Sequence, residues 1–140
     1  MATPYTAVYD RFLNRITDFN LGDFDDYTLQ EMLKSWLHTA IVNTRTSTDL
    51  SARDEKNETF SNDLSDRDIE LLAMGMTLAW IEPTLNSTEL TSQFIGGKEE
   101  KYYSQANHIA ELRALREDTR VEMKRLHSYG TYINNSYFDD

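Results

Sequence analysis

The stretch that decides the fold is SDRDIELLAMGMTLAW, from Ser65 to Trp80. Ser65 with Asp68 three residues later is the pattern of a helix start, in which polar side chains cap free backbone N–H groups. From Ile69 to Trp80, apolar residues fall on several faces of the expected helix, and a helix that is apolar nearly all round lies at the centre of a fold. Gly75 has no side chain, so we expect another helix to approach closely there.

The residues after this stretch predict a break and two further helices. Pro83 should end or kink the central helix, because proline lacks the N–H of the helical ladder and clashes with the preceding turn. We expect a fourth helix over Thr84–Ile95 and a firm break at Gly96-Gly97. A long charged amphipathic helix should then run over about Ser104–Tyr129 and stop at Gly130.

Two helices are expected before the central stretch. Thr3 and Pro4 suit the N-cap and the first position of a helix. The apolar positions that follow at helical spacing are Tyr5, Val8, Tyr9, Phe12, Leu13 and Ile16. Thr28 with Glu31 is a second capping pattern. The buried stripe of the helix that it opens should contain Leu29, Met32, Leu33, Trp36, Leu37, Ala40 and Ile41.

The segment Asp49–Leu64 has weak periodicity and many charges, which favours a long loop, with Phe60 and Leu64 pinning it to the body. No alternating strand pattern of useful length is present, nor any Asn-Gly or Asp-Gly hairpin dipeptide. The expected fold class is therefore all-α, a compact bundle of about five helices that ends in a long C-terminal helix. We expect this helical domain over residues 1–130 and an extended C-terminal docking tail over residues 131–140.

Composition and charge exclude several classes of protein. The chain has 140 residues, the size of one domain, and a formal net charge of −10 at pH 7. A free-standing nucleic-acid-binding protein normally has the opposite sign, so the acidity fits ordinary solubility or a surface that repels DNA. The lack of cysteine excludes disulfides, thiolate metal sites and a cysteine nucleophile. The longest uncharged apolar run, Leu71–Ile81, is far shorter than the ~18 residues of a membrane span.

We find no motif for catalysis, metal binding or cofactor binding. His38 and His108 have no second ligand at metal spacing, and His127 would suit the last turn of a helix. Adjacent carboxylates such as Asp25 and Asp26 lie in polar loops, which offer no pocket to separate their pKa values. We therefore expect a protein that is not an enzyme and that holds neither metal nor cofactor.

The last expected helix has an apolar seam between opposite charges. At about 100° per residue, the seam contains Leu112, Leu115, Thr119, Met123 and Leu126. The basic flank contains Arg113, Arg116, Arg120 and Lys124, and the acidic flank contains Glu111, Asp118 and Glu122. One interpretation is a solvated face with intrahelical ion pairs. The other is a lateral subunit interface, with the basic flank of one subunit against the acidic flank of the next in a closed ring.

The C-terminal segment TYINNSYFDD, Thr131–Asp140, is rich in aromatic residues and has no helical period. Its apolar residues Tyr132, Ile133, Tyr137 and Phe138 gain nothing from exposure to water. Because aromatic residues are enriched in interface cores, this segment is interpreted as a tail that docks on another protein. The alternative is a frayed terminus.

Four stretches carry a resemblance to a known class of protein. They are YDRFLNRITDF (Tyr9–Phe19), LSDRDIELLAMGMTLAWIEP (Leu64–Pro83), NSTEL (Asn86–Leu90) and YYSQANHIAELRALREDTRVEMKRL (Tyr102–Leu126). They resemble small all-helical proteins from the structural gene clusters of tailed bacteriophages, the head–tail connector or neck adaptor proteins. The resemblance covers most of the chain and rests on core and helix patterns.

The resemblance implies a structural protein of the virion neck, made in the cytoplasm of the bacterial host and not bound to membrane. Such adaptors form a homo-oligomeric ring of about twelve subunits beneath the portal protein. They join the portal to a further neck or tail protein, and DNA passes through the lumen without sequence-specific contact. Their C-terminal segments commonly insert into the portal, which gives the docking tail a partner.

Two other classes stay open. A phage tail-completion protein or assembly factor would bind transiently and would not remain in the particle. A small helical regulator would bind a host protein or DNA, and the basic flank of the last helix is the feature that favours DNA contact.

Overall fold

A computed structural model describes the backbone of residues 2–16, 25–95 and 99–136, and side chains within residues 2–16, 25–86 and 107–127. The helices are α1 (Tyr5–Arg15), α2 (Asp26–Asn43), α3 (Asp66–Ile95) and α4 (Glu99–Ser136). Three short strands, β1 (Thr3–Pro4), β2 (Arg53–Asp54) and β3 (Thr59–Phe60), form an antiparallel sheet in the order β1–β3–β2. The protein is mostly helical, as the sequence predicts.

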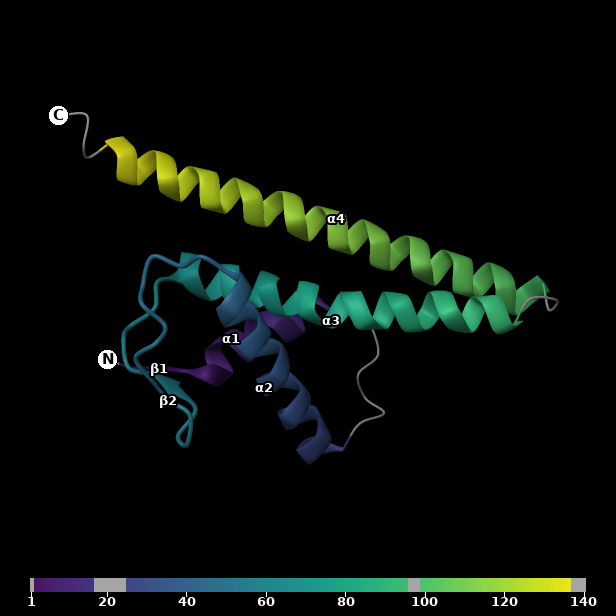
Figure 1. Cartoon of the computed structure of the whole chain (residues 1–140), viewed down its shortest axis with the longest axis horizontal. Helices are drawn as coiled ribbons and strands as arrows, with labels where there is room; N and C mark the ends of the chain where they lie inside the picture. The colour runs from purple at the N-terminus through teal and green to yellow at the C-terminus, as the bar shows by residue number, and fades with distance from the viewer. Residues whose placement is uncertain (1, 17–24, 96–98, 137–140) are drawn as a thin grey trace.

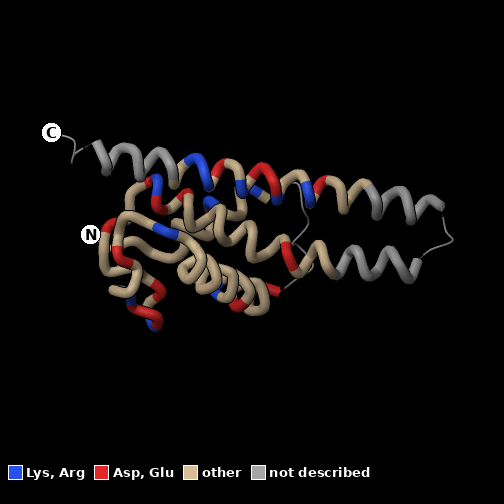
Figure 2. The backbone as a smooth tube through the Cα atoms, turned by 45° about the horizontal axis from the view of Figure 1, so that its top comes forward, with Lys and Arg blue, Asp and Glu red and all other residues tan. Residues whose placement is uncertain are grey.

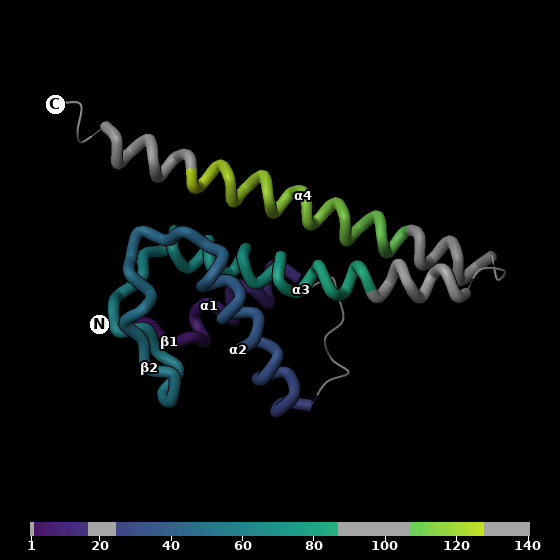
Figure 3. Tube along the Cα trace, viewed as in Figure 1, coloured from purple at the N-terminus to yellow at the C-terminus, as the bar shows by residue number. Residues whose placement is uncertain are grey.

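Helix α3 lies at the centre of the molecule. Figure 1 shows α4 along one side of α3, with α1, α2 and the sheet gathered on the other side against its first half. In the trace of Figure 3, the coloured part of α4 lies along this same half of α3. The molecule is therefore a long helical hairpin with a compact body attached to one half, and the prediction of a central third helix is confirmed.

The core sits between α1, α2 and α3. Side chains that are at most 2 % exposed there include Tyr5, Phe12, Ile16, Leu33, Leu37, Phe60, Leu72, Met76, Ile81 and Leu85. A Cβ placed on Gly75 would lie 2.5 Å from Thr44 Oγ1 and 2.9 Å from the Cβ of Ala40. The predicted close approach of another helix at Gly75 is therefore confirmed, and that helix is α2.

Pro83 lies inside α3 and does not end it, so the structure describes four helices where about five were expected. Proline removes one helical hydrogen bond and crowds the preceding turn, at a cost of ~3 kcal/mol. Ile81 before it and Leu85 after it are both buried in the core. Packing on both sides of the proline explains why the helix continues, a tertiary effect that the local sequence does not reveal.

The segment expected to be a long loop contains the hairpin of β2 and β3. β3 pairs with β1 on one side and with β2 on the other, with Thr3 opposite Phe60 and Arg53 also opposite Phe60. Phe60 and Leu64 are buried, which confirms that they pin the segment to the body. Two-residue strands are too short to show an alternating pattern, which is why the sheet was not predicted.

Two of the expected helix starts are wrong. Thr3 lies in β1, where its hydroxyl accepts a hydrogen bond from the backbone N–H of Leu64, and Pro4 is the N-cap of α1. The cap of α2 is Asp25, whose carboxylate accepts from the N–H of Thr28 at 2.7 Å. At α3 the expected cap is confirmed, because Ser65 Oγ accepts from the N–H of Asp68 at 3.1 Å.

Helix α4 continues through Gly130 to Ser136, so Thr131–Ser136 are helical and not extended as expected. Glycine inside a helix costs only about 1 kcal/mol relative to alanine, so it does not by itself stop a helix. The rest of the expected tail, residues 137–140, and the break expected at Gly96-Gly97 lie outside the described residues.

Candidate functional site

The apolar seam of α4 packs on α3 within the same chain. Leu112 and Thr119 are fully buried, and Leu115, Met123 and Leu126 are half-buried. The guanidinium of Arg67 on α3 also donates to the backbone carbonyl of Leu126 at 2.8 Å. The centre of this seam is therefore covered by α3 of the same chain.

Two members of the basic flank bind a carboxylate of α3. Arg120 Nη2 lies 2.9 Å from Glu82 Oε1, and Arg116 Nη1 lies 3.6 Å from Glu82 Oε2. Two guanidinium groups thus share one carboxylate, and this trio carries a net positive charge. Because Glu82 and Arg120 are about half-exposed, solvent screens these pairs and each contributes little to stability.

One member of the acidic flank joins an ion-pair network across three helices. Glu122 Oε2 lies 3.2 Å from Arg15 Nη2 on α1, and Arg15 Nη1 lies 2.6 Å from Glu70 Oε1 on α3. Arg11 also approaches Glu70, at 3.3 Å. These contacts hold α4 against both α1 and α3.

The remaining members of both flanks are exposed. They are Arg113 and Lys124 on the basic flank and Glu111 and Asp118 on the acidic flank. Figure 2 shows both signs of charge following one another along α4. Arg116, Arg120 and Glu122 of the predicted lateral interface thus form ion pairs with α3 or α1, and its other four members are exposed.

The last part of α4 extends beyond the start of α3, as Figure 1 shows at its yellow end. Arg67, near the start of α3, is level with Leu126. The ten residues from His127 to Ser136 continue past that point. At a rise of 1.5 Å per residue they add about 15 Å. Two of the predicted anchors, Tyr132 and Ile133, belong to this helical extension, and Tyr137 and Phe138 lie outside the described residues.

A cavity of about 350 Å³ opens between the end of α2, the middle of α3 and α4. It is lined by Thr39, Asn43, Thr44, Gly75, Leu78, Ala79, Glu82, Arg120 and Met123. The lining is apolar at Leu78, Ala79 and Met123, and charged at Glu82 and Arg120. Thr44 is 8 % exposed, and its hydroxyl has no hydrogen-bond partner among the described residues.

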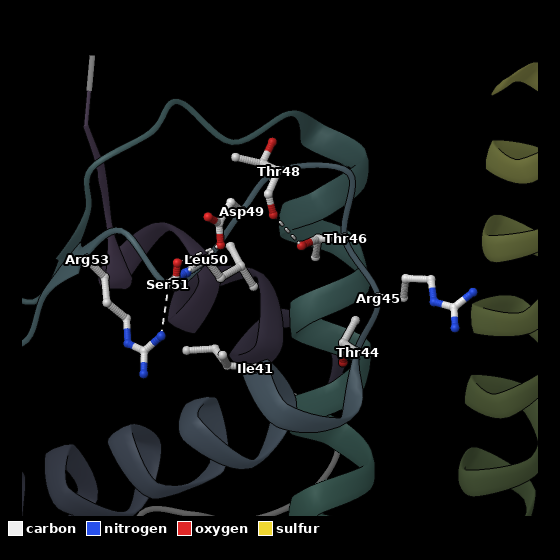
Figure 4. A pocket seen from close by; sticks show the side chains of 9 residues that line it. All are labelled: Ile41, Thr44, Arg45, Thr46, Thr48, Asp49, Leu50, Ser51 and Arg53. Atoms are coloured by element: carbon white, nitrogen blue, oxygen red, sulfur yellow. Dashed lines mark hydrogen bonds between the residues drawn. The ribbon is translucent and has the colours of Figure 1, made fainter.

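A second cavity of about 390 Å³ lies on the loop between α2 and β2. Figure 4 shows Asp49 and Ser51 gathered on this loop, while Arg45 points away from the other lining side chains. Asp49 accepts from the N–H and hydroxyl of Ser51, and Arg53 donates to the carbonyl of Leu50 at 2.9 Å. These polar groups bind one another, so they do not converge on a ligand.

Two polar clusters were not predicted from the sequence. The fully buried carboxylate of Asp68 accepts from the N–H and hydroxyl of Ser47 and from the N–H of Thr48, which closes the loop after α2 over α3. The imidazole of His38 lies 2.9 Å from the carboxylate of Glu55 on the hairpin. The partners in each cluster are distant in sequence, so a local sequence pattern cannot predict their contact.

Burial and the charges of the hairpin shift the pKa values of three side chains in this region. Arg53, and then His38, hold the pKa of the Glu55 carboxyl below its usual range. Burial, followed by the charge of Glu55, raises the pKa of Tyr5 to about 12. Burial likewise raises the pKa of Tyr9 well above its usual range. The pair of His38 and Glu55 joins the hairpin to α2, and the contact between the Tyr5 and Phe60 rings joins it to α1.

His127 is not in the last turn of its helix, because α4 continues to Ser136. Burial lowers the pKa of its imidazole. The expected interaction with a helix C-terminus is therefore wrong.

Within the part of the chain that the structure describes, no group of three or more His, Cys, Asp or Glu residues could hold a metal ion. None of the described helical segments is both long and apolar enough to cross a membrane.

Comparisons with protein-family models, with curated proteins and with solved structures give no significant match to this chain.

Proposed function

We propose that the protein is a head–tail connector of a tailed bacteriophage, a structural virion protein that forms a ring beneath the portal and joins it to the tail. The observation that carries the proposal is the end of α4, which reaches about 15 Å beyond the start of α3. A projecting helix that leads into an aromatic segment suits an element that docks into a partner.

Charge and composition also support this proposal. The net charge of −10 suits the wall of a channel through which DNA slides without binding tightly. Exposed charges of both signs on α4 offer complementary edges for neighbouring subunits. The sequence resemblance to neck adaptors adds the portal and a further neck or tail protein as partners.

The docking segment consists of the helical end of α4 and the four residues after it. Tyr132, Ile133, Tyr137 and Phe138 are its proposed anchors for the portal, because aromatic anchors often contribute ~2 kcal/mol or more each where they fill pockets. The lateral contact uses the charged flanks of α4, with Arg113, Arg116, Arg120 and Lys124 of one subunit against Glu111, Asp118 and Glu122 of the next. Arg116, Arg120 and Glu122 also form ion pairs with α3 or α1.

The test combines a protein inventory of purified virions with variants of the docking segment. Mass spectrometry should find the chain in the particle, whereas a transient assembly factor would be absent from it. Replacing Tyr132, Ile133, Tyr137 and Phe138 with serine should leave DNA-filled heads without tails, while thermal stability of the purified protein changes little.

The matched control replaces Asn134 and Asn135 with serine in the same segment and should give infectious particles. Normal tails on the variant that lacks all four anchors would remove the docking role. Salt-dependent binding to DNA by the isolated protein, with no chain in virions, would favour the regulator instead.

A further inference from the structure

The cavity between α2, α3 and α4 has the chemistry of a receptor for one aromatic side chain with a polar tip. Leu78, Ala79 and Met123 provide apolar contacts. The buried hydroxyl of Thr44 lines the same cavity and has no hydrogen-bond partner among the described residues. A buried polar group without a partner costs free energy, so an occupant that brings a hydroxyl group gains an additional contact there.

The charge at one edge of the cavity favours an acidic occupant. Glu82 and Arg120 both line the cavity, and Glu82 is shared by Arg116 and Arg120. This trio has one positive charge in excess, on a chain whose net charge is −10. An aromatic residue beside a carboxylate therefore complements both the apolar lining and the charged edge.

Tyr27 meets this description on the surface of the same protein. It is 76 % exposed at the start of α2, and it is preceded by Asp25 and Asp26. Burial of this exposed aromatic side chain in an apolar cavity would contribute favourable free energy. Its ring is apolar and its hydroxyl can bind that of Thr44.

Tyr27 cannot enter the cavity of its own chain. It lies at the start of α2 and Asn43 at the end, sixteen residues away along one helix. This separation is about 24 Å. The two complementary surfaces thus lie at opposite ends of one rigid helix, so the contact must form between two molecules, head to tail.

We propose that Tyr27 and Asp26 of one molecule dock into the α2–α3–α4 cavity of a second copy, with Tyr27 against Leu78 and Met123 and Asp26 near Arg120. This lateral contact rests on the proposed function, in which copies of the chain form a ring. A head-to-tail contact of this kind closes into a ring when its rotation allows. The contact adds α2 to the surfaces already assigned on α4.

The absence of native cysteine permits a direct test by cross-linking. Gln30→Cys places a thiol one helical turn from Tyr27, and Asn43→Cys places one at the cavity. Both positions are exposed, so the fold should be retained. Treatment of the doubly substituted full chain at millimolar concentration with a short bis-maleimide should give a ladder of covalent multimers, because the two thiols of one chain are about 20 Å apart.

Further substitutions in the doubly substituted chain test the ring, the hydroxyl and the charge of the contact one at a time. Tyr27→Ser should abolish the ladder, and Tyr27→Phe, which keeps the ring but loses the hydroxyl, should reduce it partially. Asp26→Lys should reduce the cross-linked fraction about threefold, as expected for a half-exposed ion pair. Asp10→Lys, the same charge change at an exposed position on α1, is the matched control and should leave the ladder intact.

Absence of multimers from the doubly substituted chain would overturn the proposal. Cross-linking of Gln30→Cys alone or of Asn43→Cys alone into dimers would also overturn it, since both indicate a two-fold contact. The virion inventory tests the proposed function separately. A chain that is present in virions but gives no ladder would remove this contact and leave the connector role unaffected.

Discussion

The body of the molecule and helix α4 are held in different ways. The body, made of α1, α2, the sheet and the first half of α3, is stabilised by fully buried side chains such as Phe12, Leu37 and Leu72. Along the described side chains of α4, only Leu112 and Thr119 are buried, and the other contacts are half-buried or are ion pairs at the surface. Elements with few buried apolar contacts open locally at a lower free-energy cost than the core. We therefore expect α4 to separate from α3 more easily than the body unfolds.

The same substitution in the two regions should show the largest contrast. Leu72→Ala removes a fully buried side chain from the body and should lower the free energy of unfolding by about 2–5 kcal/mol. Leu115→Ala in the half-buried seam of α4 should cost only about 1–2 kcal/mol. Urea denaturation followed by circular dichroism measures both. Equal losses would mean that α4 is as integral to the core as α3.

The buried carboxylate of Asp68 tests the body in a second way. Asp68→Asn keeps the shape but turns an N–H donor towards the donors of Ser47 and Thr48, so we expect a loss of about 2–3 kcal/mol. Asp49→Asn is the control, because Asp49 is exposed and its partner Ser51 lies in the same loop. If both variants unfold at the same urea concentration, the loop after α2 does not depend on Asp68.

Two glycine-to-alanine substitutions should change the stability by smaller amounts and in opposite directions. Gly75→Ala places a methyl group 2.5 Å from Thr44 Oγ1 and 2.9 Å from the Cβ of Ala40. Overpacking costs about 1–3 kcal/mol, which exceeds the gain of about 1 kcal/mol in helix propensity. Gly130→Ala, in the helical backbone of α4, should instead stabilise the protein by up to about 1 kcal/mol. A shift to higher melting temperature in both variants would show that α2 can move away from α3 at little cost.

The sequence predicted the parts of the fold that local pattern controls. The apolar faces of α1, α2 and α3 and the cap at Ser65 were predicted from residue spacing. The lack of a side chain at Gly75 predicted the close approach of another helix, which is α2. Pro83 was predicted to end or kink α3, and Gly130 to end α4. Neither residue ends its helix, because tertiary packing at Pro83 and the modest helix penalty of glycine at Gly130 decide there, and neither is visible in a local window.

The candidate surfaces were predictable only in part. The charged flanks of α4 were found from helical spacing, but the spacing did not reveal that Arg116, Arg120 and Glu122 bind residues of α3 and α1. The cavity that contains Thr44 and Arg120 joins three helices and has no local signature. Such contacts depend on distant residues, so they require the folded structure.

The smallest expected effect concerns the hairpin and its response to pH. Arg53 and then His38 hold the pKa of Glu55 below its ordinary value of 4.5. A carboxyl whose pKa is lower in the folded state stabilises the fold fully above the unfolded value, and this contribution is lost as the pH falls through the folded value. The melting-temperature difference between the native chain and Glu55→Gln should therefore shrink below about pH 4.5. The effect should be small because Glu55 is 45 % exposed and water screens its charge.

Glu111→Gln, which removes one exposed negative charge from α4, is the matched control. A difference between the native chain and Glu55→Gln that stays constant from pH 7 to pH 3 would show that the contacts of Glu55 with Arg53 and His38 do not stabilise the fold.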